Sequence, residues 1–182
     1  LCSLTQKVQS AEAKLGLRLN YFQIVTALAF LYFAKRNCEI AVLETGLGGR
    51  LDPTNVLKAP LVSIITAIGL DHIELLGSSL SLIAREKAGI IKPCCDTVLL
   101  KQNAQVEAVI LDACAKQNSR LFFAEKPKAE IEGFGLKLCT ELGSFELGLN
   151  GNYQAENAAL ALCAISRLNE KGFCIPKEAI KK

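Results

Sequence analysis

Methionine and tryptophan are absent from this 182-residue chain, and histidine occurs once, at His72. The eight cysteines form no Cys-x-x-Cys pair, so they offer little from which to build a Cys/His zinc site. We therefore interpret them as free, buried thiols in a reducing compartment, where disulfides are rare. Because even an initiator methionine is missing, we expect a fragment of a longer protein.

Long runs of one charge sign and long apolar runs are absent as well. The formal net charge is only +3 and the basic residues are scattered, so we expect neither nucleic acid nor an anionic membrane as a partner. The longest apolar-rich stretch, residues 21–34, is too short to span a bilayer. The hydrophobic content of 51% instead suits a sheet that is covered on both faces.

Two common catalytic motifs are also missing. No Gly-x-x-x-x-Gly-Lys-Ser/Thr phosphate loop occurs, and the glycine-rich segment 46–49 does not replace it, because no lysine or hydroxyl follows at the required spacing. No Gly-x-Ser-x-Gly elbow is present. Catalysis by cysteine would need a neighbouring histidine, and nothing singles out one of the eight cysteines.

Apolar, β-branched runs alternate with helical patterns along the chain. The patterns predict strands at 40–43, 61–68, 97–101 and 120–124, and helices at 4–15, 21–37, 80–91, 106–116 and 153–168. Such alternation favours βαβ units, and hence an α/β fold with a mostly parallel sheet covered by helices. Near residues 127–149, short alternating pieces between glycines predict a small β-hairpin excursion.

Polar side chains follow two of the predicted strands at their carboxyl ends. Glu44 ends the first run and opens a loop that contains Arg50 and Asp52, while Asp71 and His72 follow the second. Ligands of open α/β sheets collect at this edge, so Glu44 is well placed to hold a cation. His72 could ligate a metal, orient a phosphate or cap the next helix. An ordinary turn with a surface ion pair stays open as the alternative.

Lys87 stands out on the helix predicted at 80–91. The apolar residues of this helix recur at helical spacing, and Lys87 falls in the middle of that stripe. Lysine rarely occupies a buried face without a partner or a task, although its stem can also snorkel to a nearby edge. A single site formed by Glu44, His72 and Lys87 is therefore a hypothesis.

Three motifs in matching order and spacing closely resemble the folylpolyglutamate synthase/dihydrofolate synthase family, which belongs to the Mur-ligase-like ATP-dependent amide ligases. They span residues 44–55, 66–72 and 86–92, and shorter matches lie at 21–23 and 153–159. The resemblance covers residues from about 20 to 170. Family members usually have glutamate in place of Gln23 and histidine in place of Tyr153.

The resemblance implies that residues 1–182 are the central and C-terminal part of an ATP-binding, Mur ligase-like domain. The phosphate loop would precede the chain and a second domain would follow it. In the family, the residues matching Glu44 and His72 hold Mg²⁺, and the lysine matching Lys87 is carbamylated, which makes it a metal ligand. The residue matching Asn157 contacts adenine, and we place Gln154 beside it.

Lys87, Arg50 and Asp52 are the residues that this resemblance leads us to expect in catalysis. The implied reaction is ATP-dependent ligation of L-glutamate to a pteroate or folate carboxylate through an acyl phosphate. ATP and Mg²⁺ would be the cofactors, the location cytoplasmic, and activity confined to the full-length protein. Two alternatives stay open: a Mur-type cell-wall amino-acid ligase, and a non-catalytic remnant of the fold that binds folate or a partner.

Overall fold

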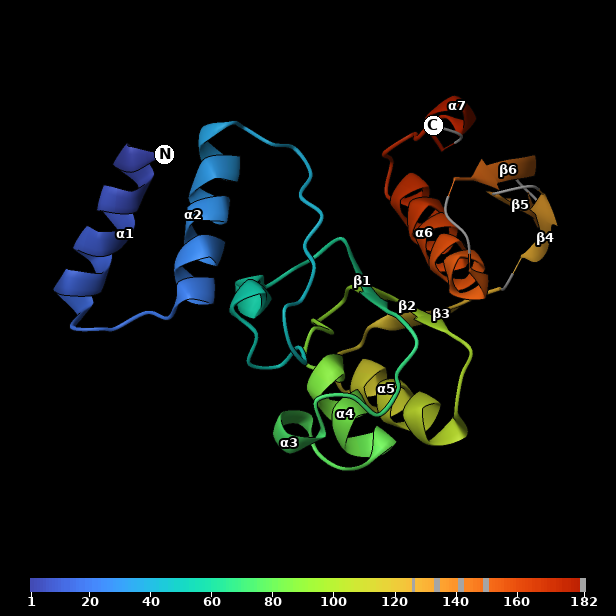
Figure 1. Cartoon of the computed structure of the whole chain (residues 1–182), viewed down its shortest axis with the longest axis horizontal. Coiled ribbons are helices and arrows are strands. Elements are labelled where there is room, and N and C mark those ends of the chain that lie inside the picture. The colour runs from blue at the N-terminus through green and yellow to red at the C-terminus, as the bar shows by residue number, and fades with distance from the viewer. Residues whose placement is uncertain (126, 133–134, 141–142, 149–150, 181–182) are drawn as a thin grey trace. The chain divides into compact units, whose positions relative to one another are not determined.

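A computed structural model describes residues 1–125, 127–132, 135–140, 143–148 and 151–180. The chain divides into two compact units, Leu1–Val56 and Leu57–Lys182 (Figure 1). Within the described ranges, no helix combines the length and the apolar character that crossing a bilayer requires.

The first unit consists of helices α1 (Cys2–Leu15) and α2 (Tyr21–Lys35) and a short 3₁₀ turn, η1 (Pro53–Val56). Helix α1 ends at Gly16, whose φ of 62° gives a left-handed cap. Helix α2 starts with a capping box, in which Asn20 and Gln23 each accept a 2.9 Å hydrogen bond from the other's backbone N–H. Gln23, a departure from the family pattern, thus fixes the start of α2.

The strand predicted at 40–43 is wrong. Residues 1–56 contain no strand, and Ile40 and Val42 are 46% and 94% exposed. An apolar, β-branched run supplies only a propensity, whereas a strand also requires a neighbour that bonds its N–H and C=O groups. Among the described residues, none pairs with this segment.

The second unit is built on a parallel sheet of three strands in the order β1 (Val62–Ile65), β2 (Asp96–Leu100) and β3 (Arg120–Ala124). The predicted α/β class and parallel pairing are confirmed. Strand β2 lies in the centre and is buried along its whole length, as expected for a strand covered on both faces.

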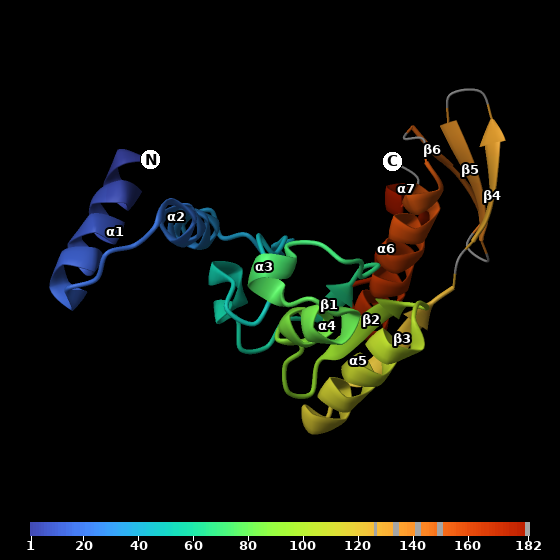
Figure 2. The same cartoon turned by 60° about the horizontal axis from the view of Figure 1, so that its bottom comes forward.

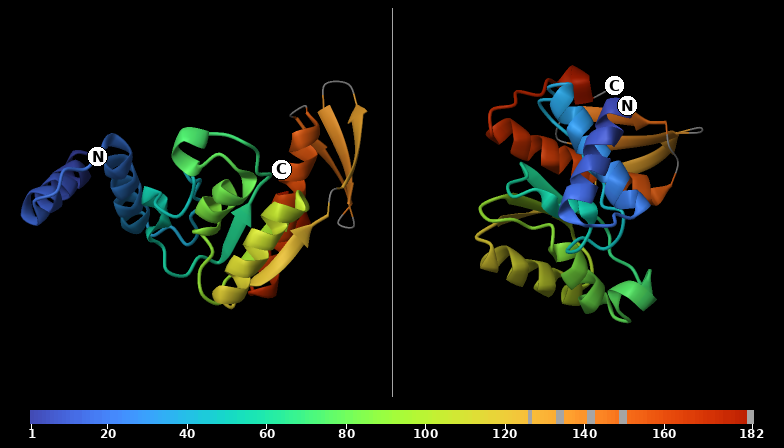
Figure 3. Two further views of the ribbon diagram at one scale, coloured as in Figure 1. Left: turned by 90° about the horizontal axis from the view of Figure 1, so that it is seen from below. Right: turned by 90° about the vertical axis from the view of Figure 1, so that its left-hand side faces the viewer.

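Helices cover both faces of this sheet (Figures 1 and 3). Helices α4 (Leu80–Ala88) and α5 (Ala104–Lys116) pack on the face that presents Leu99, and α6 (Asn152–Glu170) packs on the face that presents Val98 and Leu100. This arrangement follows from the alternation of side chains along a strand. Two short helices, α3 (Ile73–Leu76) and α7 (Lys177–Ile180), complete the unit.

Helix α4 is shorter than predicted, since it ends at Ala88 rather than Ile91. Gly89 caps it, and glycine is a poor helix former, so the chain leaves the helix before it reaches Pro93.

The predicted excursion is an antiparallel sheet of three strands, β4 (Lys128–Glu132), β5 (Gly135–Thr140) and β6 (Gly143–Leu147) (Figure 2). The sheet packs against α6 through a small cluster in which Leu136, Leu138 and Phe145 contact Ala155.

Candidate functional site

Asp52 organises the loop that carries Arg50. Its side chain is buried at 7% exposure, and its carboxylate accepts hydrogen bonds from the backbone N–H of Leu47 (2.9 Å) and from the backbone N–H (2.9 Å) and hydroxyl (2.6 Å) of Thr54. Bonds of this kind to an ionised acceptor are roughly twice as strong as neutral ones. Asp52 therefore fixes the conformation of its own loop through these hydrogen bonds.

Glycine allows the start of this loop to lie close to Phe22. A Cβ on Gly46 would lie 2.6 Å from the ring of Phe22, which is closer than van der Waals contact allows. Glu44 and Arg50, which flank the glycines, are both exposed. The Asn55 side-chain amide donates to the Arg50 carbonyl at 3.2 Å, which ties this part of the loop to η1. The loop thus exposes one acidic residue, Glu44, and one basic residue, Arg50. Hydrogen bonds within the loop fix its backbone.

His72 follows β1 in the left-handed region, with φ 48° and ψ 39°. Few residues other than glycine adopt this conformation, and they concentrate at functional sites. Asp71 Oδ1 accepts a 2.8 Å bond from the His72 N–H, and Asp71 Oδ2 lies 3.7 Å from His72 Nε2. The two side chains are 82% and 57% exposed, so the imidazole is accessible and has an acid beside it.

Lys87 lies half-buried on α4, between the buried residues Ala84 and Ala88. The predicted inward stripe is confirmed for the buried apolar residues of this region, Ile83 and Ile91 among them. The placement of Lys87 at the margin of that stripe fits a stem that is covered and a head that reaches solvent. Its carbamylation stays a prediction.

Gln154 and Asn157 lie in the first turns of α6. The Asn157 side-chain amide donates to Gln154 Oε1 at 3.4 Å, and Asn157 is exposed. Their spacing of three residues places them on one side of the helix. The structure thus brings together the two residues predicted for the nucleotide site.

The predicted site residues divide between the two units. Glu44, Arg50 and Asp52 belong to Leu1–Val56, whereas His72, Lys87, Gln154 and Asn157 belong to Leu57–Lys182. In the described part of the chain, no three His, Cys, Asp or Glu side chains group closely enough to hold a metal ion. The predicted metal shell contains only two such residues, and its convergence stays a prediction.

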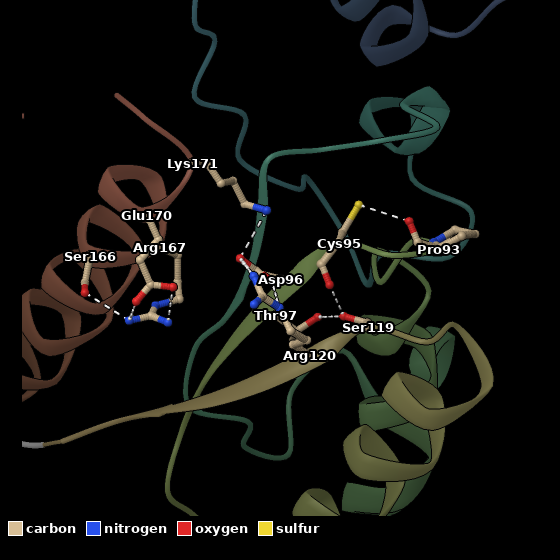
Figure 4. Close-up of polar contacts among 10 residues, drawn as sticks. All are labelled: Pro93, Cys95, Asp96, Thr97, Ser119, Arg120, Ser166, Arg167, Glu170 and Lys171. Carbon is tan, nitrogen blue, oxygen red and sulfur yellow. Dashed lines mark hydrogen bonds and ion pairs between the residues drawn. The ribbon is translucent and has the colours of Figure 1, made fainter. Parts of the chain in front are cut away.

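Sequence reasoning missed a buried charge cluster at the amino edge of the parallel sheet (Figure 4). Asp96, at the start of β2, is 1% exposed, and its carboxylate pairs with the Arg120 guanidinium in a bidentate contact at 2.9 and 3.1 Å. Lys171, which caps α6, lies 3.1 Å from the second oxygen. The cluster therefore fastens the end of α6 to the sheet. Its only local signal is an acid as the first residue of a buried strand.

Two arginines lie over one ring beside this cluster. The Arg120 and Arg167 guanidinium carbons are 5.5 and 4.1 Å from the centre of the Phe122 ring, within cation–π range. Arg167 is also held by Glu170 (2.6 and 2.8 Å) and by Ser166 (3.0 Å), as Figure 4 shows. These contacts orient the last turns of α6.

The thiols differ from the predicted pattern. All eight are free, but five are exposed, so the prediction of buried thiols is wrong for these; they are Cys2, Cys38, Cys94, Cys139 and Cys174. Burial raises the pKa of the Cys95, Cys114 and Cys163 thiols. These three are therefore protonated at neutral pH and poorly nucleophilic.

A groove of about 670 Å³ lies between α4 and α5. Its charged lining residues are Arg85, Lys92, Asp112 and Lys116, and it contains none of the predicted site residues. Asp112 and Lys116 pair at 2.6 Å across one helical turn. We assign this groove no part in the chemistry.

Comparison with known proteins finds relatives over most of this chain. Residues 3–165 match the model of the Mur ligase middle domain. Folylpolyglutamate synthase of Lacticaseibacillus casei is 36% identical over 166 residues, covering 86% of this chain and 38% of that protein. Dihydrofolate synthase/folylpolyglutamate synthase of Mycobacterium tuberculosis is 36% identical over 177 residues, covering 89% and 36%.

Solved structures agree with the sequence matches. A folylpolyglutamate synthase complex with AMPPCP and folate superposes with a TM-score of 0.86 at 30% identity, covering 96% of this chain and 45% of that one. The chain thus spans less than half the length of the relatives it matches.

Proposed function

Because the chain belongs to the Mur ligase middle-domain family, in its folylpolyglutamate synthase/dihydrofolate synthase branch, we propose that the protein containing it ligates L-glutamate to a pteroate or folate carboxylate. The observation that carries the proposal is the match, over 96% of this chain, to a structure that holds a nucleotide analogue and folate. In this proposal residues 1–182 are the central and C-terminal part of the ATP-binding domain, and the location is cytoplasmic.

The proposed reaction has two steps. ATP transfers its γ-phosphoryl group to the folate carboxylate, which gives an acyl phosphate and ADP. The glutamate amine then attacks the acyl carbon, phosphate leaves, and an amide forms. Most of the catalysis in phosphoryl transfer comes from positioning and charge neutralisation, which suits a site of fixed loops and charged side chains.

Glu44, His72 and a carbamylated Lys87 are the residues that would hold Mg²⁺. The donor set fits the ion in kind, because two of the three ligands would be carboxylate-like oxygens, which Mg²⁺ prefers. Glu44 is exposed and the His72 side chain is 57% exposed, so both side chains are accessible. Mg²⁺, when bound, neutralises charge on the phosphoryl group in transfer.

The other predicted residues bind and orient. Arg50 would contact a phosphate or the substrate carboxylate from the loop that Asp52 shapes. Asn157, with Gln154 beside it on α6, would contact the adenine of ATP. An amide side chain suits this task, because it offers a donor and an acceptor to the base edge.

The test uses the full-length protein and measures ATP-dependent glutamate ligation. We expect Glu44→Ala and His72→Ala each to lower kcat/KM by about 10- to 100-fold, as loss of groups that hold or orient a metal commonly does. Glu39→Ala and Glu74→Ala, which remove exposed acids nearby in sequence, are the matched controls and should stay within about twofold of wild type. Ligation that survives in both Glu44→Ala and His72→Ala would refute the assignment.

Acceptor choice separates this function from a cell-wall ligase. Phosphate release that depends on a pterin carboxylate supports the proposal, whereas release that depends only on a nucleotide-linked sugar peptide contradicts it. If neither acceptor supports release by the wild-type protein, the non-catalytic alternative is correct.

A further inference from the structure

Gln102, two residues beyond β2, bonds three backbone groups with its side-chain amide. Its Oε1 accepts a 2.8 Å hydrogen bond from the Ile68 N–H, and its Nε2 donates to the carbonyls of Thr66 (3.4 Å) and Leu100 (3.2 Å). Thr66 and Ile68 belong to the segment that leaves β1 and leads to His72, 34 to 36 residues earlier in the chain.

Two of these bonds imitate a step of a parallel β-ladder. The ladder between β1 and β2 ends at the pair Ile65 and Leu99. In a parallel ladder, a residue bonds the C=O before its partner and the N–H after it. The Gln102 side-chain amide bonds the C=O of Thr66 and the N–H of Ile68. These two groups lie before and after Ala67, so Ala67 takes the place of the partner residue in the ladder. The side chain therefore extends the pairing beyond the last strand residues.

The backbone of Gln102 is itself held in place by the start of α5. The Gln102 backbone N–H donates to Glu107 Oε1 at 2.8 Å, and Asn103 caps α5 by accepting a 2.8 Å bond from the Gln105 N–H. On the other side of the contact, Ile68 is buried in the core between the sheet and α4 and α5. The start of α5 thus fixes the position of Gln102, and Gln102 in turn fixes the segment that follows β1.

We propose that Gln102 is a positioning residue for segment 66–72, which carries Asp71 and His72. The proposal rests on the proposed function, in which His72 belongs to the Mg²⁺–ATP site. Without the amide, Thr66 and Ile68 would turn their backbone groups to water, and the segment would gain alternative conformations. The left-handed backbone of His72 would then be held less firmly, and the imidazole would lose its orientation.

The test is steady-state kinetics of the full-length protein with Gln102→Leu, which removes all three bonds at similar side-chain volume. We expect the KM for Mg²⁺–ATP to rise about tenfold, the usual cost of losing a group that orients a metal ligand. The KM for glutamate should stay within about twofold of wild type. Gln105→Leu, an exposed glutamine on the first turn of α5, is the matched control and should resemble wild type.

Gln102→Glu gives a second readout, and it also serves if Gln102→Leu does not fold. Its carboxylate keeps the bond from Ile68 but turns an acceptor toward the Thr66 and Leu100 carbonyls. Protonation restores a donor, so the excess in KM over wild type should shrink as the pH falls through the pKa of this carboxyl.

Activity that falls with the folded fraction alone, at unchanged KM values, would overturn the proposal, because this is what a purely structural role predicts. Hydrogen exchange of residues 66–72 separates this failure from failure of the proposed function. If the wild-type protein ligates nothing, the proposed function fails, yet faster exchange in Gln102→Leu than in Gln105→Leu still supports positioning of the segment. Equal exchange in the two variants overturns it.

Discussion

The buried carboxylate of Asp96 yields a prediction about stability. Asp96→Asn keeps the shape of the side chain and removes the charge that faces Arg120 and Lys171. Asp96 is 1% exposed, whereas the side chains of Arg120 and Lys171 are 63% and 27% exposed. The substitution thus leaves two cations that water can partly hydrate, next to a neutral amide that still accepts one bond.

The expected cost follows from these exposures. Removing one partner of a fully buried pair costs about 3–5 kcal/mol, and hydrogen bonds to charged groups contribute about 1.5–3 kcal/mol each. Since both cations reach solvent, we expect Asp96→Asn to lower the free energy of unfolding by about 2–3 kcal/mol. Arg120→Ala should cost only about 1 kcal/mol, because Lys171 remains to pair with the carboxylate.

Asp112→Asn is the matched control. It makes the same chemical change in an exposed acid, 62% exposed, whose partner Lys116 lies 2.6 Å away. Exposed pairs on a helix contribute about 0.3–0.5 kcal/mol, and salt screens them, whereas it screens buried pairs much less. Urea unfolding followed by circular dichroism, at low and at high salt, measures all three variants. A cost of Asp96→Asn within about 0.5 kcal/mol of that of Asp112→Asn would refute the reasoning.

Two further predictions compare neighbours of opposite burial. At pH 8, maleimide should modify the exposed Cys94 in the native protein, and Cys95 only after unfolding, because burial removes the Cys95 thiol from solvent and raises its pKa. Peptide mass spectrometry measures the modification of both cysteines. Similar rates for the two in the native protein would contradict the prediction. Ile83→Ala, at 1% exposure, should lower the free energy of unfolding by about 2–5 kcal/mol. Leu82→Ala, at 42% exposure, should cost less than about 1 kcal/mol, and equal losses in urea unfolding would argue against the packing of α4.

Local patterns predicted the second unit well. Strand β3 has the predicted bounds, Arg120–Ala124, because its apolar run is short and the helical pattern before it ends clearly. The run at 40–43 shows the limit of the same signal: its composition resembles that of β1, yet only β1 has a partner strand. Pairing is a property of two segments, and one segment does not encode it alone.

The candidate site divides in the same way. Motifs predicted His72 and Asn157 as site residues, and their roles stay predictions. Their local settings, on a strand exit and a helix start, are as predicted. The contacts of Gln102 with Thr66 and of Asp96 with Lys171 join positions far apart in the chain. No periodicity or spacing in the sequence predicts these contacts. A glutamine after a strand and an acid at the start of one are ordinary residues in the sequence, because their partners are known only from the fold.

The two sheets of the second unit differ in how far apart their paired segments lie, and this has a consequence for folding. The antiparallel sheet pairs residues close in sequence, such as Lys128 and Cys139. Strand β1 instead pairs with β2, which starts at Asp96 and follows α3 and α4 in the sequence. Loop closure over the longer distance costs more entropy, so the parallel pairing is the slower event. During synthesis, β1 leaves the ribosome well before β2, with its edge unpaired. Unpaired strand edges favour aggregation, so the nascent chain is most vulnerable between the emergence of β1 and its pairing with β2.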